Sequence, residues 1–182
     1  TVGYATMYGD ATGFFAAFGD LWKYQIYDLA AEANRRYPGV IPEKVFTIPP
    51  SAELSSAQAV EQGKGDPLYY PYHDYLLRAF VEWNVNPEQI LAWYQEGTLA
   101  KSLGCSEEAL SIACPNAAKL VEDTEYWWRQ FMGIGLAKRL QSPPVLALSY
   151  HSFAMPRHES QNGVYFTQRY QERKAALLAQ QK

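Results

Sequence analysis

Lys23 is the first residue of this chain whose type and position could serve to bind an anion. It follows the segment GDLW and falls in the first turn of a helix that we expect from Asp20 to about Arg36. A helix N-terminus presents free backbone N–H groups and a partial positive charge, so a lysine there is unfavourable unless an anion lies nearby. Lys23 is therefore a candidate phosphate ligand, and a plain solvated lysine is the alternative.

Ser51 is the second candidate, because it follows two consecutive prolines in the segment TIPPSAEL, residues 47–54. Each proline fixes its own φ angle, lacks a backbone donor and pushes the residue before it toward an extended conformation. Pro49 and Pro50 should thus form a rigid strut that holds the Ser51 hydroxyl in a repeatable place. The alternative is a stiff connector ending in a turn, since proline and serine are common turn residues.

The segment before Lys23, residues 3–22, contains separated glycines together with Asp10 and Asp20. Glycines allow a backbone to approach a bound ligand closely. Neither a Walker-type loop nor a G-x-G-x-x-G motif is present in the sequence, so the two common phosphate-binding signatures are absent.

The elements that would position these residues are mostly helices, as the spacing of apolar residues and the capping residues indicate. We expect a first helix capped by Asp20 and stopped by Pro38-Gly39, and a second along Leu76, Ala79, Phe80 and Trp83. A third should run from Asn86-Pro87 to near Gly97 with Gln89 as capping-box partner, followed by a short helix capped by Ser106. A longer helix should bury Leu120, Thr124, Trp127, Trp128 and Phe131 on one face before Gly133 and Gly135 interrupt it, and an exposed helix should begin at Thr167. PVLALSY, residues 144–150, reads as one short strand.

Composition places the chain among folded globular proteins. Of its 182 residues, 48% are hydrophobic and 19% are charged, which suits one domain or a large piece of one. A net charge of −3 argues against broad binding of nucleic acid. The sequence contains neither an apolar run of membrane-spanning length nor a leader of the secretory type, so we expect a soluble, cytoplasmic protein that does not bind membranes.

The cysteines and histidines do not suggest a metal site. Cys105 and Cys114 lie nine residues apart with no histidine nearby, which favours two reduced thiols over a zinc site. His73, His151 and His158 show no ligand spacing, so each is expected to be a surface or packed histidine.

Four segments, taken in order, resemble a known family: GYATMYGDATGFFAAFGDLWKYQIYDLA, IPEKVFTIPPSAEL, DPLYYPYHDYLL and KRLQSPP. Together they resemble the second half of the synthetase domain of NAD synthetases, in particular the glutamine-dependent type. The likeness spans residues 3–83 and, more loosely, 120–150. It implies a mainly α fragment of an α/β, adenine-nucleotide alpha-hydrolase-like (Rossmann-like) synthetase domain with little strand of its own. Residues 1–150 would form the C-terminal part of that domain, and residues 151–182 a C-terminal loop and helix.

The resemblance also implies a reaction in which ATP adenylates nicotinic acid adenine dinucleotide and ammonia, taken from glutamine or free in solution, then displaces AMP to give NAD. The implied cofactors are ATP and Mg²⁺, the partners are these small molecules, and a homo-oligomer is expected. Of the residues that match the family's motifs, Lys23 and Ser51 would bind ATP. Those that would bind the dinucleotide are Met7, Asp10, Phe14, Asp66, Lys138 and Arg139.

The family's Ser-Gly-Gly-x-Asp-Ser pyrophosphatase loop and the nitrilase-like glutaminase domain do not occur in these 182 residues. No catalytic residue and no metal ligand are therefore assigned, and we expect the chain to be an inactive fragment of a ligase. Two rival hypotheses are a noncatalytic helical interaction module derived from such an enzyme and another amidating ligase of the ATP-pyrophosphatase type.

Overall fold

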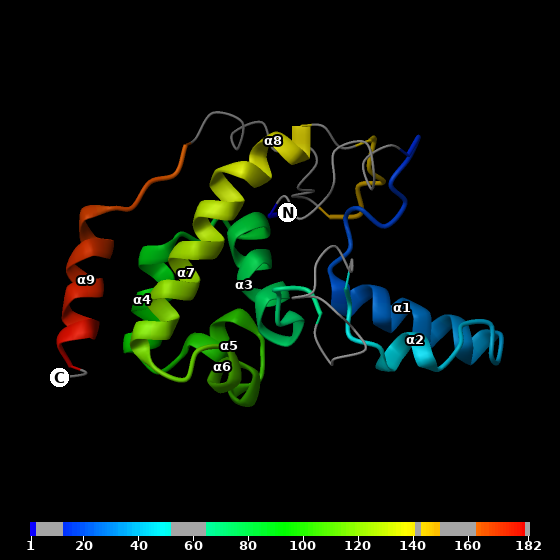
Figure 1. Ribbon diagram of the computed structural model, residues 1–182, viewed down its shortest axis with the longest axis horizontal. Coiled ribbons are helices and arrows are strands. Elements are labelled where there is room, and N and C mark those ends of the chain that lie inside the picture. The colour runs from blue at the N-terminus through cyan, green and yellow to red at the C-terminus, as the bar shows by residue number, and fades with distance from the viewer. Residues whose placement is uncertain (3–12, 52–64, 141–142, 150–162, 181–182) are drawn as a thin grey trace.

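The structure is a computed structural model that describes residues 1–2, 13–51, 65–140, 143–149 and 163–180, with the side chains of residues 139 and 140 excepted. Within these ranges the chain is mostly helical and has no β-strand. The helices are α1 (Lys23–Arg36), α2 (Lys44–Thr47), α3 (Tyr70–Glu82), α4 (Pro87–Gln95), α5 (Leu99–Leu103), α6 (Glu107–Ala113), α7 (Ala117–Met132), α8 (Ile134–Leu140) and α9 (Gln168–Ala179). Figure 1 shows α1 and α2 at one end of the molecule, α4, α7 and α9 at the other, and α3 between them.

The core lies among α3 to α7 and α9. The apolar face predicted for α7 is confirmed, because all five of its residues, Leu120, Thr124, Trp127, Trp128 and Phe131, are buried. The rings of Phe80 on α3 and Trp128 meet edge to face with their centroids 5.0 Å apart. The tryptophan pair is thus part of the core, as the helical spacing indicated.

Three helices are capped by nearby residues, and two of these caps, Asn86 and Ser106, were predicted and are confirmed. The side chains of Asn86, Ser106 and Thr167 accept hydrogen bonds from the backbone N–H groups three residues later, at 3.1, 3.0 and 3.0 Å. These bonds satisfy N–H groups that a helix N-terminus would otherwise leave unpaired.

Helix α9 is less exposed than we expected. Tyr170 is fully buried and Leu177 is nearly so. The Tyr170 hydroxyl also donates a hydrogen bond of 2.9 Å to Glu125 Oε1 on α7. Most residues of α9 are exposed, as expected, but these two residues at i and i+7 bury one side of the helix against α4 and α7.

The strand expected at residues 144–150 does not form within 144–149, and Tyr150 lies outside the described residues. Only Val145 pairs, in an isolated parallel bridge with Ala16. Further along, the backbone N–H groups of Leu148 and Ser149 donate to the Asp20 carboxylate, at 2.5 and 2.6 Å. The donors that would extend a ladder are therefore taken by a side chain.

Those same bonds correct the predicted cap of α1. The helix begins at Lys23, and Asp20 caps nothing because its carboxylate is turned toward residues 148 and 149. The cap comes instead from α3, where Asp74 Oδ2 accepts a hydrogen bond of 2.9 Å from the Tyr24 N–H. The start of α1 is thereby joined to the helical core.

None of the helices in the described part of the chain combines the length and the apolar character that crossing a bilayer requires.

Candidate functional site

A cavity of about 720 Å³ lies between α1, α2, the Pro49–Pro50 strut and the first turn of α3. Among the described residues, aromatic rings and prolines form most of its wall, and Lys23 and Asp66 are its charged members. Its other lining residues are Tyr24, Tyr27, Phe46, Thr47, Ile48, Pro49, Pro50, Gly65, Leu68, Tyr69, Tyr70, Pro71, Tyr75 and Ser106. A space of this size is in the usual range for small-molecule and cofactor sites.

The strut is held in place by the segment that begins at Gly65. The Asp66 N–H donates a hydrogen bond of 2.7 Å to the Pro50 carbonyl oxygen. Gly65 approaches that carbonyl so closely that a Cβ at this position would lie 2.7 Å from its oxygen. A glycine is therefore needed here, and the end of the strut is fixed next to Asp66.

Lys23 and Asp66 are connected through one aromatic residue. The Lys23 ammonium lies 5.6 Å from the centroid of the Tyr70 ring and 5.9 Å from that of Tyr27, within reach of cation–π attraction. The Tyr70 hydroxyl donates a hydrogen bond of 2.6 Å to Asp66 Oδ2. Among the described residues, no carboxylate forms an ion pair with Lys23.

Ser51 lines a second cavity, of about 550 Å³, that adjoins the first at the strut. Lys23, Tyr27 and the two prolines line both spaces. The structure therefore brings Lys23, Ser51 and Asp66 together around the strut, and their roles in binding ATP and the dinucleotide stay predictions.

Two other predicted site residues that the structure describes, Phe14 and Lys138, do not line either cavity. The side chain of Phe14 is almost fully exposed, and Lys138 on α8 lines neither cavity. Arg139 belongs to α8, but its side chain lies outside the described part of the structure. Met7 and Asp10 lie outside the described residues as well.

The expectation of free N–H groups at the start of α1 was wrong, because a protein carboxylate takes them. Asp74 is buried, and its carboxylate binds the N–H of Tyr24 with a smaller contribution from that of Lys23. Burial raises the pKa of Asp74 to about 6, although these hydrogen bonds and the Lys23 charge act to lower the pKa. An anion bound at this end of α1 would therefore meet the Lys23 side chain, not the helix backbone.

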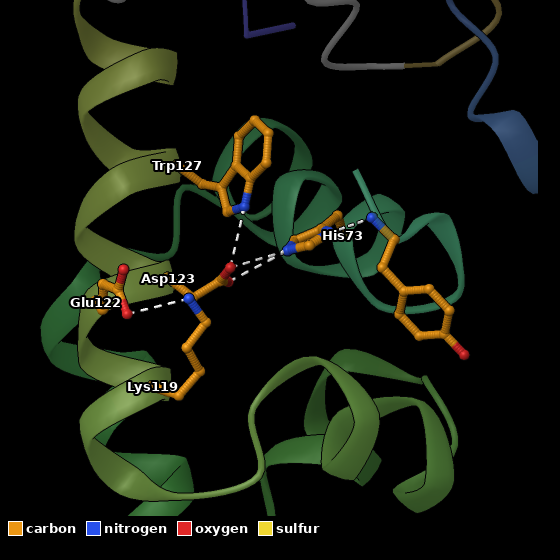
Figure 2. A network of polar contacts seen from close by, with 6 residues as sticks. His73, Lys119, Glu122, Asp123 and Trp127 are labelled. Atoms are coloured by element: carbon orange, nitrogen blue, oxygen red, sulfur yellow. Dashed lines mark hydrogen bonds and ion pairs between the residues drawn. The ribbon is translucent and has the colours of Figure 1, made fainter. Parts of the chain in front are cut away.

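A polar network behind the cavity anchors the first turn of α3 (Figure 2). His73 Nδ1 accepts a hydrogen bond of 2.7 Å from the Tyr69 N–H, so in the neutral ring the proton sits on Nε2. That nitrogen lies 3.1 Å from Asp123 Oδ1, which also accepts a bond of 3.2 Å from Trp127 Nε1. The network thus connects the start of α3 to α7 inside the core.

His73, predicted to be a surface or packed residue, is confirmed as packed, but its partner Asp123 was not predicted. The two residues lie fifty positions apart, and no local motif pairs them. The signal that was present is the position of His73, three residues before Leu76 on the buried face of α3. His151 and His158 lie outside the described residues.

The implied magnesium finds no ligand set in the described part of the chain. No group of three His, Cys, Asp or Glu side chains suited to a metal ion occurs there, and Asp66 is the single carboxylate that lines either cavity. Cys105 and Cys114 are both free thiols.

The described part of the chain is helical and has a candidate small-molecule site between α1, α3 and the proline strut, and comparison with known proteins specifies the class. The family model described as NAD synthase matches residues 1–104, which is more than half of the chain. The chain belongs to the NAD synthase family, as its sequence segments indicated.

Curated relatives agree with this assignment. The chain is similar to the glutamine-dependent NAD(+) synthetase of Aquifex aeolicus, with 43% identity over 92 residues, which are 50% of this chain and 15% of the relative. It is also similar to the enzyme of the same description from Synechocystis sp., with 40% identity over 152 residues, 84% of this chain and 22% of the relative. The NH(3)-dependent NAD(+) synthetase of Helicobacter pylori is 37% identical over 71 residues, 39% of this chain and 24% of the relative.

The chain therefore spans less than a quarter of the length of each of these relatives. No solved structure matches it.

Proposed function

We propose that this chain is part of an ATP-dependent NAD synthetase, a ligase that adenylates nicotinic acid adenine dinucleotide and then amidates it with ammonia to form NAD. Membership of the NAD synthase family supports this proposal. The observation that carries it in the structure is the arrangement of Lys23 and Ser51 on two adjoining cavities that share the Pro49–Pro50 strut.

In this proposal the Lys23 ammonium neutralises charge on the phosphates of ATP. It is suited to this because the described residues give it aromatic rings as neighbours and no carboxylate in ion-pair contact. The Ser51 hydroxyl would add a neutral hydrogen bond to the same nucleotide, aimed by the strut. The apolar wall of tyrosines, prolines and Phe46 would keep water away from the bound phosphates, which strengthens the electrostatic attraction.

Mg²⁺ would supply further charge neutralisation on the phosphates during adenylation, and the described residues do not provide its ligands. We infer that other parts of the synthetase provide the metal ligands and the pyrophosphatase loop. The described helices would then belong to an α/β, Rossmann-like domain, with residues 1–150 completing that domain and 151–182 forming its C-terminal loop and helix. Asp66, Phe14, Lys138, Arg139, Met7 and Asp10 would contribute to the dinucleotide site. A cytoplasmic homo-oligomer that takes its ammonia from glutamine completes the proposal.

The test is NAD formation by the complete encoded polypeptide, supplied with ATP, magnesium, nicotinic acid adenine dinucleotide and either ammonia or glutamine. The complete polypeptide should form NAD, and the 182-residue chain alone should not. Lys23→Ala should lower kcat/KM for ATP by about tenfold to a hundredfold, because a charge-assisted contact contributes about 1.5–3 kcal/mol.

Ser51→Ala should cost less, about 1 kcal/mol, because a neutral hydrogen bond contributes less than a charged one. Failure of the complete polypeptide to form NAD would contradict the proposed reaction and favour the noncatalytic module. An unchanged kcat/KM for ATP in Lys23→Ala, with an unchanged melting temperature, would remove this helix from the ATP site.

A further inference from the structure

Tyr70, the first residue of α3, joins the two residues that the proposed function assigns to ATP. Its ring lies 5.6 Å from the Lys23 ammonium, and its hydroxyl donates a bond of 2.6 Å to Asp66 Oδ2. The backbone N–H of Asp66 in turn donates a bond of 2.7 Å to the carbonyl of Pro50, the residue directly before Ser51. A continuous series of contacts thus runs from Lys23 to Ser51, and Tyr70 lies near its middle.

We propose that Tyr70 is a positioning residue that fixes the Lys23 ammonium and the Ser51 hydroxyl relative to each other for a nucleotide bound at the strut. This inference rests on the proposed function, and it adds a residue that does not itself need to touch the nucleotide. The ring and the hydroxyl of Tyr70 have different roles. The ring restrains Lys23, and the hydroxyl restrains Ser51 through Asp66 and Pro50.

Asp66 depends on Tyr70 for its orientation. Its Oδ2 accepts from the Tyr70 hydroxyl, whereas its Oδ1 is buried and has no hydrogen-bond partner among the described residues. Without the tyrosine hydroxyl the carboxylate would lose its described side-chain partner. Because Asp66 is half-buried and its Oδ1 already lacks a described partner, loss of the bond to Oδ2 would favour movement of the segment toward water, which would release the Pro50 carbonyl.

Tyr70 is itself held rigidly enough to act in this way. Pro71 follows it at the start of α3. The preceding residue, Tyr69, donates its backbone N–H to His73 Nδ1, and His73 contacts Asp123 on α7 (Figure 2). The position of Tyr70 is therefore set by the buried network of the core, on the side of the cavity away from α1 and α2.

Two substitutions separate the two ends of the residue. Tyr70→Phe keeps the ring over Lys23 and removes the bond to Asp66, whereas Tyr70→Leu removes both. The measurement is the Kd of ATP for the complete encoded polypeptide by isothermal titration, with Tyr37→Leu as control, since Tyr37 is an exposed tyrosine just after α1. We expect Tyr70→Phe to weaken ATP binding by about threefold to tenfold, and Tyr70→Leu by about a further threefold to tenfold.

Double variants supply the readout that a purely structural role would not change. If Tyr70 acts through Ser51, Tyr70→Phe should have little effect on ATP binding once Ser51→Ala is present. If its ring acts through Lys23, the difference in ATP affinity between Tyr70→Phe and Tyr70→Leu should largely disappear in a Lys23→Ala background. Melting temperatures near that of the wild type show that each variant folds, and Tyr70→Phe alone tests the hydroxyl should the leucine variant not fold.

The outcomes separate the role of Tyr70 from the proposed nucleotide site. Weaker ATP binding in Lys23→Ala and Ser51→Ala, combined with unchanged binding in both Tyr70 variants, would overturn the role of Tyr70 and leave the proposed function standing. If the fold-changes in the Kd of ATP simply multiply in the double variants, the two substitutions act independently, and the role of Tyr70 would also be overturned. Unchanged ATP binding in Lys23→Ala and Ser51→Ala would overturn the nucleotide site and, with it, this inference.

Discussion

The carboxylate of Asp74 on α3 accepts a hydrogen bond of 2.9 Å from the backbone N–H of Tyr24 on α1, fifty residues away in the sequence. A buried carboxylate therefore does the work that a local cap residue normally does. Ionised, it pairs with the positive end of α1, but burial penalises its charge more than these contacts compensate, so its pKa is raised to about 6.

The raised pKa of Asp74 predicts how stability changes with pH. Because the folded-state pKa lies above the unfolded value of 3.8, folding binds a proton between these two values. The stabilisation is fully present below about pH 4 and is lost as pH rises through about 6. Relative to Asp74→Asn, which cannot titrate, the wild type should lose roughly 2–3 kcal/mol of unfolding free energy between pH 4 and pH 7.

Urea titrations of both proteins across this range provide the measurement, and the difference between them isolates Asp74 from other titrating groups. Asp28→Asn, at an exposed position on α1, is the matched control and should run parallel to the wild type. Parallel curves for the wild type and Asp74→Asn would mean that Asp74 has the same pKa in both states.

Asp123 should be far more important for stability than its sequence neighbour Glu122. Asp123 is nearly buried and accepts hydrogen bonds from His73 and Trp127, so Asp123→Ala leaves two donors in the core without a partner (Figure 2). We expect a loss of about 2–4 kcal/mol of unfolding free energy. Denaturant unfolding monitored by tryptophan fluorescence and circular dichroism would measure it.

Glu122→Ala is the control for that substitution. Glu122 lies one residue away on the same helix, and its ion pair with Lys119 is exposed. It should change stability by less than about 1 kcal/mol. Similar losses of unfolding free energy for the two variants would indicate that any substitution in this part of α7 destabilises the protein, and that the buried network around Asp123 has no special role.

Features of the fold that depend on near neighbours were predictable from the sequence. The caps by Asn86, Ser106 and Thr167 act within three residues, and the buried stripe of α7 follows directly from helical periodicity. The cap of α1 was not predictable, because Asp20 has the right type and place but its carboxylate binds residues 148 and 149, and the cap comes from Asp74. Nothing local distinguishes these two aspartates.

In the candidate site, too, local features were predictable from the sequence and long-range contacts were not. The proline strut could be recognised from two adjacent residues, because each proline restricts its own φ angle. Its attachment to Asp66 could not, since the bond between Asp66 and Pro50 closes a loop of sixteen residues. The role of Tyr70 between Lys23 and Asp66 likewise depends on where α3 begins in space, which the core network around His73 determines.

The two cysteines should differ in reactivity toward iodoacetamide. Burial raises the pKa of the Cys114 thiol to about 12, while Cys105 is only half buried and its pKa is raised as well. Because the thiolate is the reactive form, a thiol with a pKa of about 12 is ionised at a level of about one part in ten thousand at pH 8. Mass spectrometry of the folded protein should therefore find Cys114 unmodified while Cys105 reacts slowly.

The Cys105→Ser variant allows Cys114 to be followed alone. Its single thiol should react only when urea unfolds the chain, at a rate set by unfolding. Labelling of Cys114 at the rate of an unprotected cysteine in the absence of urea would contradict its burial.

The phenylalanines before α1 lead to a prediction about self-association of the 182-residue chain. Phe14, Phe15 and Phe18 have exposed fractions of 95%, 48% and 58%, so three large apolar side chains within five residues face solvent. Burying one such ring contributes about 1.5–3 kcal/mol, and exposed apolar patches commonly mark contact surfaces. In sedimentation velocity over a hundredfold range of concentration, the average mass of the chain should rise, and the Phe14→Ser/Phe18→Ser variant should stay closer to a monomer.

Tyr37→Ser removes a similarly exposed ring near the far end of α1 and should leave the association unchanged. A wild-type chain that sediments as a monomer throughout this range would show that these rings do not drive association.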